Sequence, residues 1–182
     1  MSSNDHLAEH PVHVNPYTSS DVLQVLRENH WLTSDPTPEQ IAWADRAAQL
    51  LGHFAENPAG LAHLLRLVFE YDAAQILQST DAHAALSRNS ARDVVRHLAL
   101  LLLEPAPFTS ERFKEIVTHL KETCGLRSRD LFHPIRLALA GRTGEGELDR
   151  IPLLLDEAAA LHFAVPVKSV RTRILEFCSA LD

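Results

Sequence analysis

The side chains with the clearest capacity for chemistry are basic ones gathered between positions 121 and 142. This stretch contains two acids, Glu122 and Asp130, against five cations: Lys121, Arg127, Arg129, Arg136 and Arg142. A local basic strip can contact phosphate groups even when the whole molecule is acidic. On charge alone, the simpler interpretation is a solvated helix face that contacts only water.

Half of the six glycines, Gly141, Gly144 and Gly146, lie close together at the end of this strip and just after it. The backbone N–H groups of a glycine-rich loop can bind phosphate where a helix follows. A P-loop would continue as Gly-Lys-Ser/Thr, and a dinucleotide-binding fold would place a strand before the glycines, and the sequence shows neither. A helix C-cap followed by a turn explains this stretch better.

No arrangement of residues points to an active site. The sequence contains no nucleophile elbow, no His-Glu-x-x-His motif and no paired cysteines. The acidic pairs Glu145/Glu147 and Asp156/Glu157 could serve as general acids and bases. Beside a helix start and in a polar stretch, they are explained more simply by the helix dipole and by solubility. We therefore expect no catalytic residue and no cofactor.

Three histidines near the N-terminus have a spacing that could hold a metal ion on a helix. They are His6, His10 and His13, at i, i+4 and i+7. Pro11 lies inside this stretch and would disrupt the helix. Because no cysteine or carboxylate cluster completes the set, we expect no metal site.

The composition predicts helices. The 182 residues include 29 Leu and 23 Ala against 11 Val and 6 Ile, and Leu and Ala are the better helix formers. The net charge of −7 excludes a generally basic nucleic-acid binder. The charge is uneven, since residues 1–85 carry 3 basic and 11 acidic side chains and residues 86–182 carry 14 and 13. We expect an all-α, multi-helix bundle.

Several features indicate a cytoplasmic protein. Two cysteines, Cys124 and Cys178, are too few for a disulfide framework and are expected to be reduced. The N-terminus has no apolar signal core. The longest apolar run, 98–103, is too short to cross a membrane.

The chain divides into a mobile tail (1–19), a first helical subdomain (20–104) and a second one (105–182), the two expected to pack together. Thr37–Gln40 is a capping box that opens a helix. A second helix starts at Thr109 and stops at Gly125. The predicted core stripes of two helices are Ile41, Ala44, Ala48, Leu51 and Phe54, and Leu61, Leu64, Leu65, Val68 and Phe69.

A short helix is predicted between Pro134 and Gly141, because proline suits a first helical position and glycine suits a left-handed stop. Ile135 and Leu139 can face the core. Arg136 is one residue off this stripe, and we expect it to be largely exposed on one face with Arg127, Arg129 and Arg142.

The stretch 131–142, Leu-Phe-His-Pro-Ile-Arg-Leu-Ala-Leu-Ala-Gly-Arg, resembles the C-terminal anticodon-binding region of bacterial glutamyl-tRNA synthetases. That family has a Pro-Leu/Ile-Arg-x-Ala-Leu-Thr-Gly-Arg pattern there. Looser similarity extends from about residue 22 to the C-terminus. The resemblance implies the helical fold of the class I synthetase anticodon-binding domain.

The resemblance also implies which residues contact RNA. In the family, the arginine at the position of Arg136 reaches the anticodon, and the turn and helix after it, which here include Leu148, add base contacts. The predicted RNA-binding set is Arg127, Arg129, Arg136, Arg142 and Leu148. A rigid helix that presents an arginine beside a glycine turn suits recognition of unstacked bases. The alternative for Arg136 is an ion pair with a carboxylate inside the bundle.

Three features depart from the family pattern. Ala140 replaces the usual threonine, and Glu145-Gly146 stands where Gly-Pro is usual. The catalytic half is missing, since the sequence has no His-Ile-Gly-His-like or Lys-Met-Ser-Lys-Ser-like signature and no strand pattern for a nucleotide-binding sheet. We therefore expect that this chain does not charge tRNA by itself.

The sequence as a whole favours a free-standing anticodon-binding domain that binds tRNA of the tRNA-Glu type without catalysis. Two alternatives stay open. One is a helical protein-interaction module that kept the fold and lost the RNA surface. The other is the non-catalytic subunit of a split synthetase, which docks onto a catalytic subunit through its acidic first half.

Overall fold

The computed structural model describes residues 15–182. Within that range the chain forms ten α-helices, two 3₁₀ helices and no β-strand, which confirms the all-α prediction. In chain order they are α1 Ser19–Glu28, α2 Pro38–Leu51, η1 Gly52–Phe54, α3 Pro58–Phe69, α4 Ala73–Gln78, α5 Thr80–Leu86, α6 Asn89–Leu102, α7 Ser110–Cys124, α8 Ser128–Ala140, η2 Gly146–Asp149, α9 Pro152–Ala160 and α10 Val170–Leu181.

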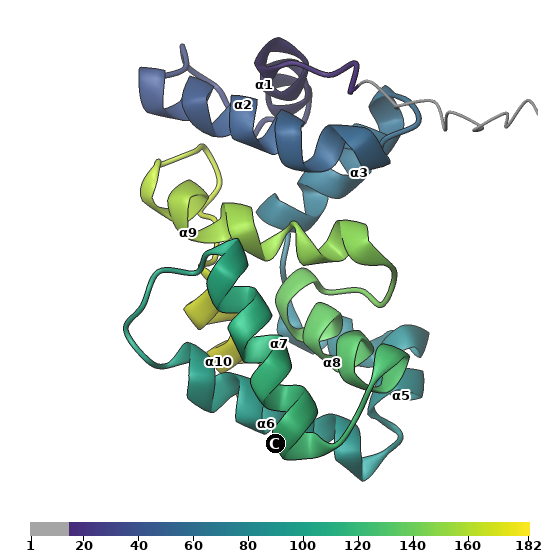
Figure 1. Ribbon diagram of the computed structural model, residues 1–182. Helices are drawn as coiled ribbons and strands as arrows, with labels where there is room; N and C mark the ends of the chain where they lie inside the picture. The colour runs from purple at the N-terminus through teal and green to yellow at the C-terminus, as the bar shows by residue number, and fades with distance from the viewer. Residues whose placement is uncertain (1–14) are drawn as a thin grey trace, which may run out of the picture.

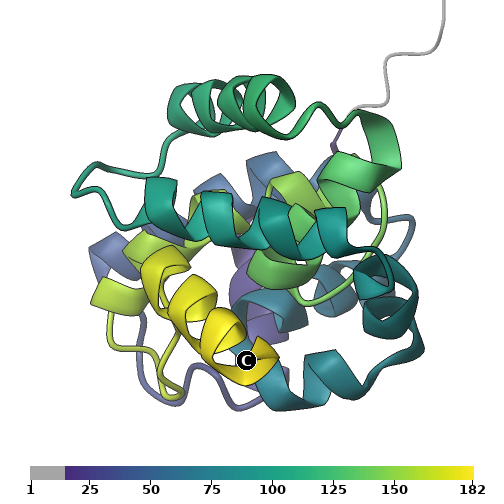
Figure 2. The ribbon, with the colours of Figure 1, turned by 90° about the horizontal axis from the view of Figure 1, so that it is seen from below.

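The helices form an upper and a lower group (Figure 1). α1, α2 and α3 make the upper group, and α9 contacts α2 and α3 from below. The lower group centres on α6, which contacts α7, α8 and α10. Figure 2 shows α7 on the outer side of α6, so that α7 forms one outer wall of the bundle.

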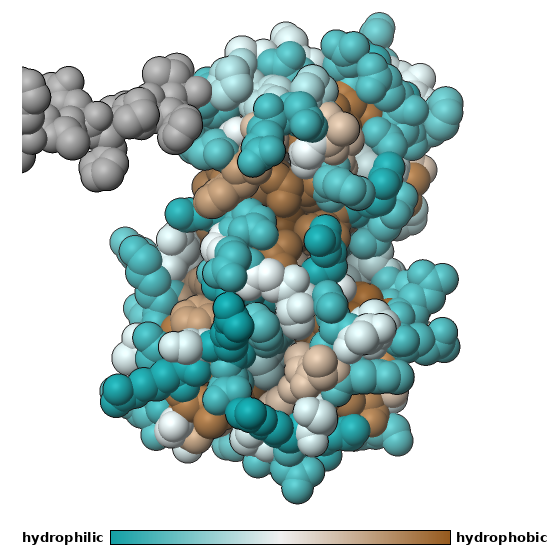
Figure 3. All heavy atoms as spheres, turned by 90° about the vertical axis from the view of Figure 1, so that its right-hand side faces the viewer, coloured by the Kyte–Doolittle hydropathy of each residue, from teal (hydrophilic) through white to brown (hydrophobic). Residues whose placement is uncertain are grey.

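One apolar core joins the two groups. The Trp31 ring stacks on Phe69 at 4.7 Å, and Trp43 meets Phe69 and Phe163 edge-on at 5.8 and 5.2 Å. The Trp43 indole N–H donates a hydrogen bond to the carbonyl of Leu154 in α9, at 3.0 Å. Burying these rings supplies a large apolar contribution, and the indole keeps its polar partner. Figure 3 shows apolar surface gathered at the waist between the two groups.

Local sequence signals set most helix ends as predicted. The capping box at Thr37 and Gln40 opens α2, and Thr109 caps α7. Gly125 ends α7 in the left-handed region, at φ 66°. The predicted stripe of α3 is fully confirmed, since all five of its residues are buried: Leu61, Leu64, Leu65, Val68 and Phe69.

The predicted stripe of α2 is wrong at both ends, because Ile41 and Phe54 are exposed. The buried face of α2 is rotated toward Gln40 and Trp43, since the Gln40 side chain donates to the carbonyl of Leu161 and the Trp43 ring fills the core. Phe54 lies in η1, after α2 has ended, so the helical period no longer places its side chain.

The helix around the arginine motif begins earlier than predicted. α8 starts at Ser128, so Pro134 lies inside the helix rather than at its first position. A proline there lacks the N–H that would bond to the carbonyl of Asp130. Asp130 lies in the exposed first turn, where water can take that place. Gly141 ends the helix as predicted, at φ 82°.

The described part of the N-terminal segment is fixed to α2. The Asn15 side chain donates to the carbonyl of Ala48 at 2.7 Å, and α1 begins at Ser19. The candidate metal histidines, His6, His10 and His13, lie outside the described residues. The division into subdomains at residue 104 remains a prediction. None of the described helices has the length and apolar character needed to span a membrane.

Candidate nucleic-acid interface

A groove of about 540 Å³ runs between α7, α8 and the η2–α9 turn, and η1 also contributes to its lining. Its lining includes three aromatic rings and three cations: Phe54, Phe113, Phe132, Lys114, Lys121 and Arg150. We call it the basic–aromatic groove. Phe54 is 44% exposed, and Phe132 is half-buried, so both rings reach solvent.

The cations of this groove have no acidic ion-pair partner within the described part of the chain. Lys114, Lys121 and Arg150 are exposed and form no ion pair with any of residues 15–182. The Lys121 ammonium lies 5.9 Å from the centre of the Phe132 ring, within reach of a cation–π interaction. Uncompensated positive charge beside a groove attracts anionic ligands.

The groove continues past Lys121 and Phe132. These two residues also line an open hollow of about 660 Å³ whose other lining residues are Arg127, Ser128 and the acidic Glu122. Arg127 is exposed and has no ion-pair partner among the described residues. One member of the predicted RNA-binding set therefore extends the same positive surface.

Arg136 is not the exposed side chain that was expected. Its side chain is 11% exposed, and it forms a two-pronged ion pair with Asp149, with Nε–Oδ1 and Nη2–Oδ2 both at 2.9 Å. The guanidinium also lies 4.9 Å from the centre of the Phe132 ring. The η2 turn folds back onto α8 and brings this carboxylate to the arginine. Of the two interpretations of Arg136, the geometry matches the internal ion pair.

Arg136 also fixes the turn that walls the groove. Its Nη1 donates to the carbonyl of Gly144 at 2.6 Å. The hydrogen bonds that Arg136 donates to Asp149 raise the pKa of Arg136, while burial acts in the opposite direction. Leu148 is 3% exposed, and a Cβ at Gly144 would lie 2.8 Å from its Cδ1. Leu148 therefore lies beneath the turn, and its contact with RNA remains a prediction.

The other two predicted arginines do not line this groove. Arg129 lines a separate hollow of about 310 Å³ with Arg88 and His133, where Arg88 pairs with Asp130 at 2.9 Å. Arg142 is exposed in the turn after α8. The predicted single face of four arginines is thus divided, since Arg127 lines one hollow, Arg129 another, and Arg136 lies inside.

Comparison with known proteins decides the family. The family model described as anticodon binding domain matches residues 13–157. The chain belongs to this family. Its match covers α1 to α8 and most of α9, and therefore every helix that walls the basic–aromatic groove.

Similar curated proteins are glutamate–tRNA ligases. The glutamate–tRNA ligase 2 of Syntrophus aciditrophicus is 32% identical over 63% of this chain and 23% of its own length. The enzyme of Exiguobacterium sibiricum is 25% identical over 76% of this chain and 28% of its own length. That of Geobacillus thermodenitrificans is 26% identical over 64% and 23%. The chain spans about a quarter of the length of the curated relatives it matches. No solved structure matches it significantly.

Sequence reasoning missed four residues of the groove in this anticodon binding domain: Phe54, Lys114, Phe132 and Arg150. Lys114 and Arg150 lie just outside the stretch singled out for its charge. Phe132 directly follows the buried Leu131 on α8. Neighbouring residues on a helix point in different directions, so the helical period predicts that Phe132 is less buried than Leu131. Phe54 comes from η1, far away in the chain, and no local signal places it there.

Proposed function

We propose that this anticodon binding domain binds tRNA through the basic–aromatic groove, without catalysis of its own. The observation that carries the proposal is the groove itself, where free cations flank aromatic rings that reach solvent. Family membership supports RNA as the ligand. The chain corresponds to about a quarter of its ligase relatives, so we assign no ligation to it.

The chemistry of the groove suits unpaired nucleotides. An unstacked base can lie on the Phe132 ring, and such stacking contributes about 1–3 kcal/mol per base. Lys114, Lys121 and Arg150 are placed to contact the phosphates on either side, and Arg127 extends this contact. Protein recognition of RNA favours single-stranded loops, because bases in a helix are stacked and hidden. We therefore assign the anticodon loop of the tRNA to this groove.

The names of the relatives support tRNA-Glu as the tRNA. Arg129 and Arg142, which are exposed outside the groove, are proposed as further phosphate contacts. Arg136 is proposed to support binding indirectly. It bonds to the Asp149 carboxylate and to the Gly144 carbonyl, and these bonds fix the turn that forms one wall of the groove. A catalytic synthetase subunit is the proposed second partner.

The test is a titration of labelled tRNA-Glu with the whole chain at several salt concentrations. The variant carries Lys114→Ala, Lys121→Ala and Arg150→Ala together. Each phosphate contact to a single strand contributes about 0.7 to the slope of log affinity against log salt. We expect the slope to fall by about 2 and the affinity to fall with it.

The matched control carries Arg27→Ala, Arg92→Ala and Arg171→Ala. These arginines lie on α1, α6 and α10, line no part of the groove, and form no ion pair with the described residues. The control loses the same charge, so a general electrostatic effect would weaken both variants equally. Equal weakening would overturn the placement of the site. Absence of tRNA binding by the unmodified chain would overturn RNA as the ligand and favour a protein-interaction module.

A further inference from the structure

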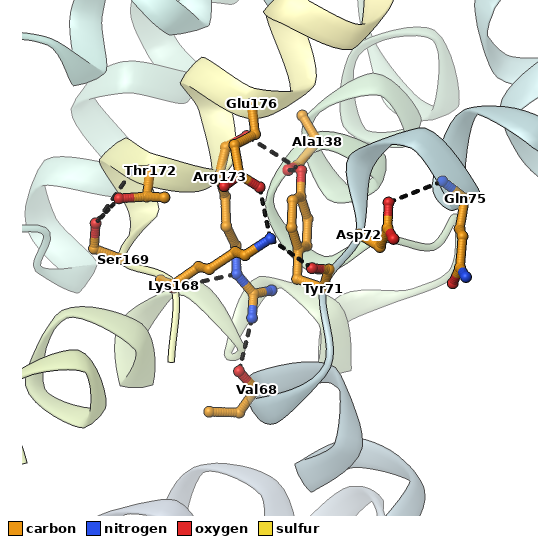
Figure 4. A network of polar contacts seen from close by, with 10 residues as sticks. All are labelled: Val68, Tyr71, Asp72, Gln75, Ala138, Lys168, Ser169, Thr172, Arg173 and Glu176. Atoms are coloured by element: carbon orange, nitrogen blue, oxygen red, sulfur yellow. Dashed lines mark hydrogen bonds and ion pairs between the residues drawn. The ribbon is translucent and has the colours of Figure 1, made fainter. Parts of the chain in front are cut away.

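A buried arginine lies where the ends of α3 and α8 meet the start of α10 (Figure 4). Arg173 is 0% exposed. It donates to three carbonyls, from Nη2 to Val68 at 2.8 Å, from Nη1 to Leu139 at 2.9 Å and from Nε to Lys168 at 3.3 Å. Its guanidinium lies 4.5 Å from the centre of the Tyr71 ring. No carboxylate of residues 15–182 pairs with it.

Burial penalises the charged form of a side chain, so a buried guanidinium destabilises the fold unless hydrogen bonds or other charges compensate for its lost hydration. Burial lowers the pKa of Arg173 to about 10. The acid nearest in the chain, Glu176, is paired with Lys168 at 2.8 Å, and Lys168 also donates to the carbonyl of Tyr71 at 3.0 Å. The guanidinium therefore interacts with the negative ends of two helices and with an aromatic face.

The bonds made here satisfy two carbonyls at the end of α8. The last four carbonyls of an α-helix have no partner within the helix. At α8, the Leu137 carbonyl accepts from the Gly141 N–H at 3.0 Å, the Ala138 carbonyl from the Tyr71 hydroxyl at 2.6 Å, and the Leu139 carbonyl from Arg173. Two of these three donors come from outside the α8 segment. Tyr71 and Arg173 thus cap the end of α8 together with Gly141.

The end of α8 leads directly into the wall of the groove. Gly141 begins the turn that reaches Gly146 and Asp149, which line the basic–aromatic groove. A Cβ at Gly141 would lie 3.1 Å from Ile76 and 3.9 Å from the Tyr71 ring, so the turn leaves α8 in close contact with the same cluster. Arg136 fixes the turn from the middle of α8, and Tyr71 with Arg173 fixes it from the end of that helix.

We propose that Tyr71 and Arg173 are positioning residues for the basic–aromatic groove, which set the 141–150 turn by capping the carbonyls of α8. The proposal rests on the proposed function for its link to RNA. Neither side chain touches the groove, and both act through the backbone of α8.

The test removes one donor and keeps the fold. Tyr71→Phe deletes the hydroxyl, which bonds to the carbonyl of Ala138 at 2.6 Å and also lies 3.3 Å from the carbonyl of Arg173, and it leaves the ring beside the guanidinium. The matched control is Tyr17→Phe, because the Tyr17 hydroxyl makes no hydrogen bond with the described residues. Hydrogen–deuterium exchange of the free protein is measured for three amides, that of Gly141, which is bonded to α8, and those of Leu148 and Arg150, which are bonded within the turn.

For Tyr71→Phe, we expect exchange in 141–150 to rise about 3- to 10-fold, as for the loss of one hydrogen bond, while exchange in α1 and α2 stays unchanged. The tRNA dissociation constant should rise by a similar factor. A role in stability alone would raise exchange evenly across the protein. An even rise, or no rise in the turn, would overturn the proposal.

Arg173→Lys supplies a second variant, because its single ammonium cannot reach all three carbonyls. We expect it to loosen the turn more than Tyr71→Phe does. If Arg173→Lys fails to fold, the comparison of Tyr71→Phe with its control still tests whether capping of the α8 carbonyls sets the turn. If the unmodified chain binds no tRNA, the proposed function fails, while the exchange pattern still tests whether Tyr71 sets the turn.

Discussion

Replacing Arg136 by alanine separates a structural ion pair from a direct contact with RNA. The guanidinium makes two 2.9 Å bonds to Asp149 and one of 2.6 Å to Gly144, with a side chain 11% exposed. Breaking a buried ion pair by removing one partner costs about 3–5 kcal/mol. Asp149 is 23% exposed and can regain some water, which favours the lower end of that range.

A loss of about 3 kcal/mol lowers the melting temperature by about 6–12 °C in a chain of this size. The assay is thermal and denaturant unfolding followed by far-UV circular dichroism, applied to Arg136→Ala, Asp149→Ala and the double variant. The double variant should be more stable than the sum of the two single losses predicts, because the second change removes the charge that the first leaves unpaired. The control is Arg142→Ala, which should change stability by less than about 0.5 kcal/mol.

The pH dependence gives a further check. The pKa of Arg136 is raised in the folded protein, so its stabilisation is fully present below the ordinary pKa of arginine and is lost only above the raised value. The coupling with Asp149 should therefore be constant through the neutral range. An unchanged melting temperature together with weaker tRNA binding would refute this reasoning and would support a direct base contact by Arg136.

Two further substitutions and one chemical modification test other parts of the structure. Phe132→Ala should weaken tRNA binding about 5- to 150-fold, measured by fluorescence anisotropy, since it removes a stacking surface. Gly141→Ala should destabilise the fold by more than about 1 kcal/mol in urea unfolding, because φ is 82° and the new Cβ would approach Ile76. Burial raises the pKa of the Cys178 thiol, so less of the reactive thiolate is present at a given pH. Iodoacetamide should therefore alkylate Cys178 more slowly than it alkylates a cysteine in an unfolded peptide.

The parts of the fold that sequence reasoning predicted are those set by local rules. The capping box at Thr37, the stripe of α3 and the glycine stops at Gly125 and Gly141 each depend on residues within one or two helical turns. The start of α8 was missed because proline at an inner position is tolerated when the carbonyl it leaves free lies in the exposed first turn.

The candidate site was predicted less well, because it is made by tertiary contacts. Charge pointed to the right stretch of chain, but Arg136 finds its partner in Asp149 only after the η2 turn folds back onto α8. Phe54 reaches the groove from η1, far away in the chain. The burial of Arg173 could be predicted from the sequence, because this residue lies between Val170 and Ile174 on the buried stripe of α10, where an arginine is unusual.

Photocrosslinking from position 132 tests most directly the claim that the basic–aromatic groove binds the anticodon loop. A benzoyl-phenylalanine substituted for Phe132 is illuminated in complex with tRNA-Glu, and the crosslinked nucleotide is identified by sequencing. The matched control places the same group at Leu100, an exposed position on α6. We predict crosslinks from position 132 to unpaired nucleotides of the anticodon loop and none from position 100. Equal crosslinking from both positions, or crosslinks from position 132 to paired stems alone, would contradict the claim.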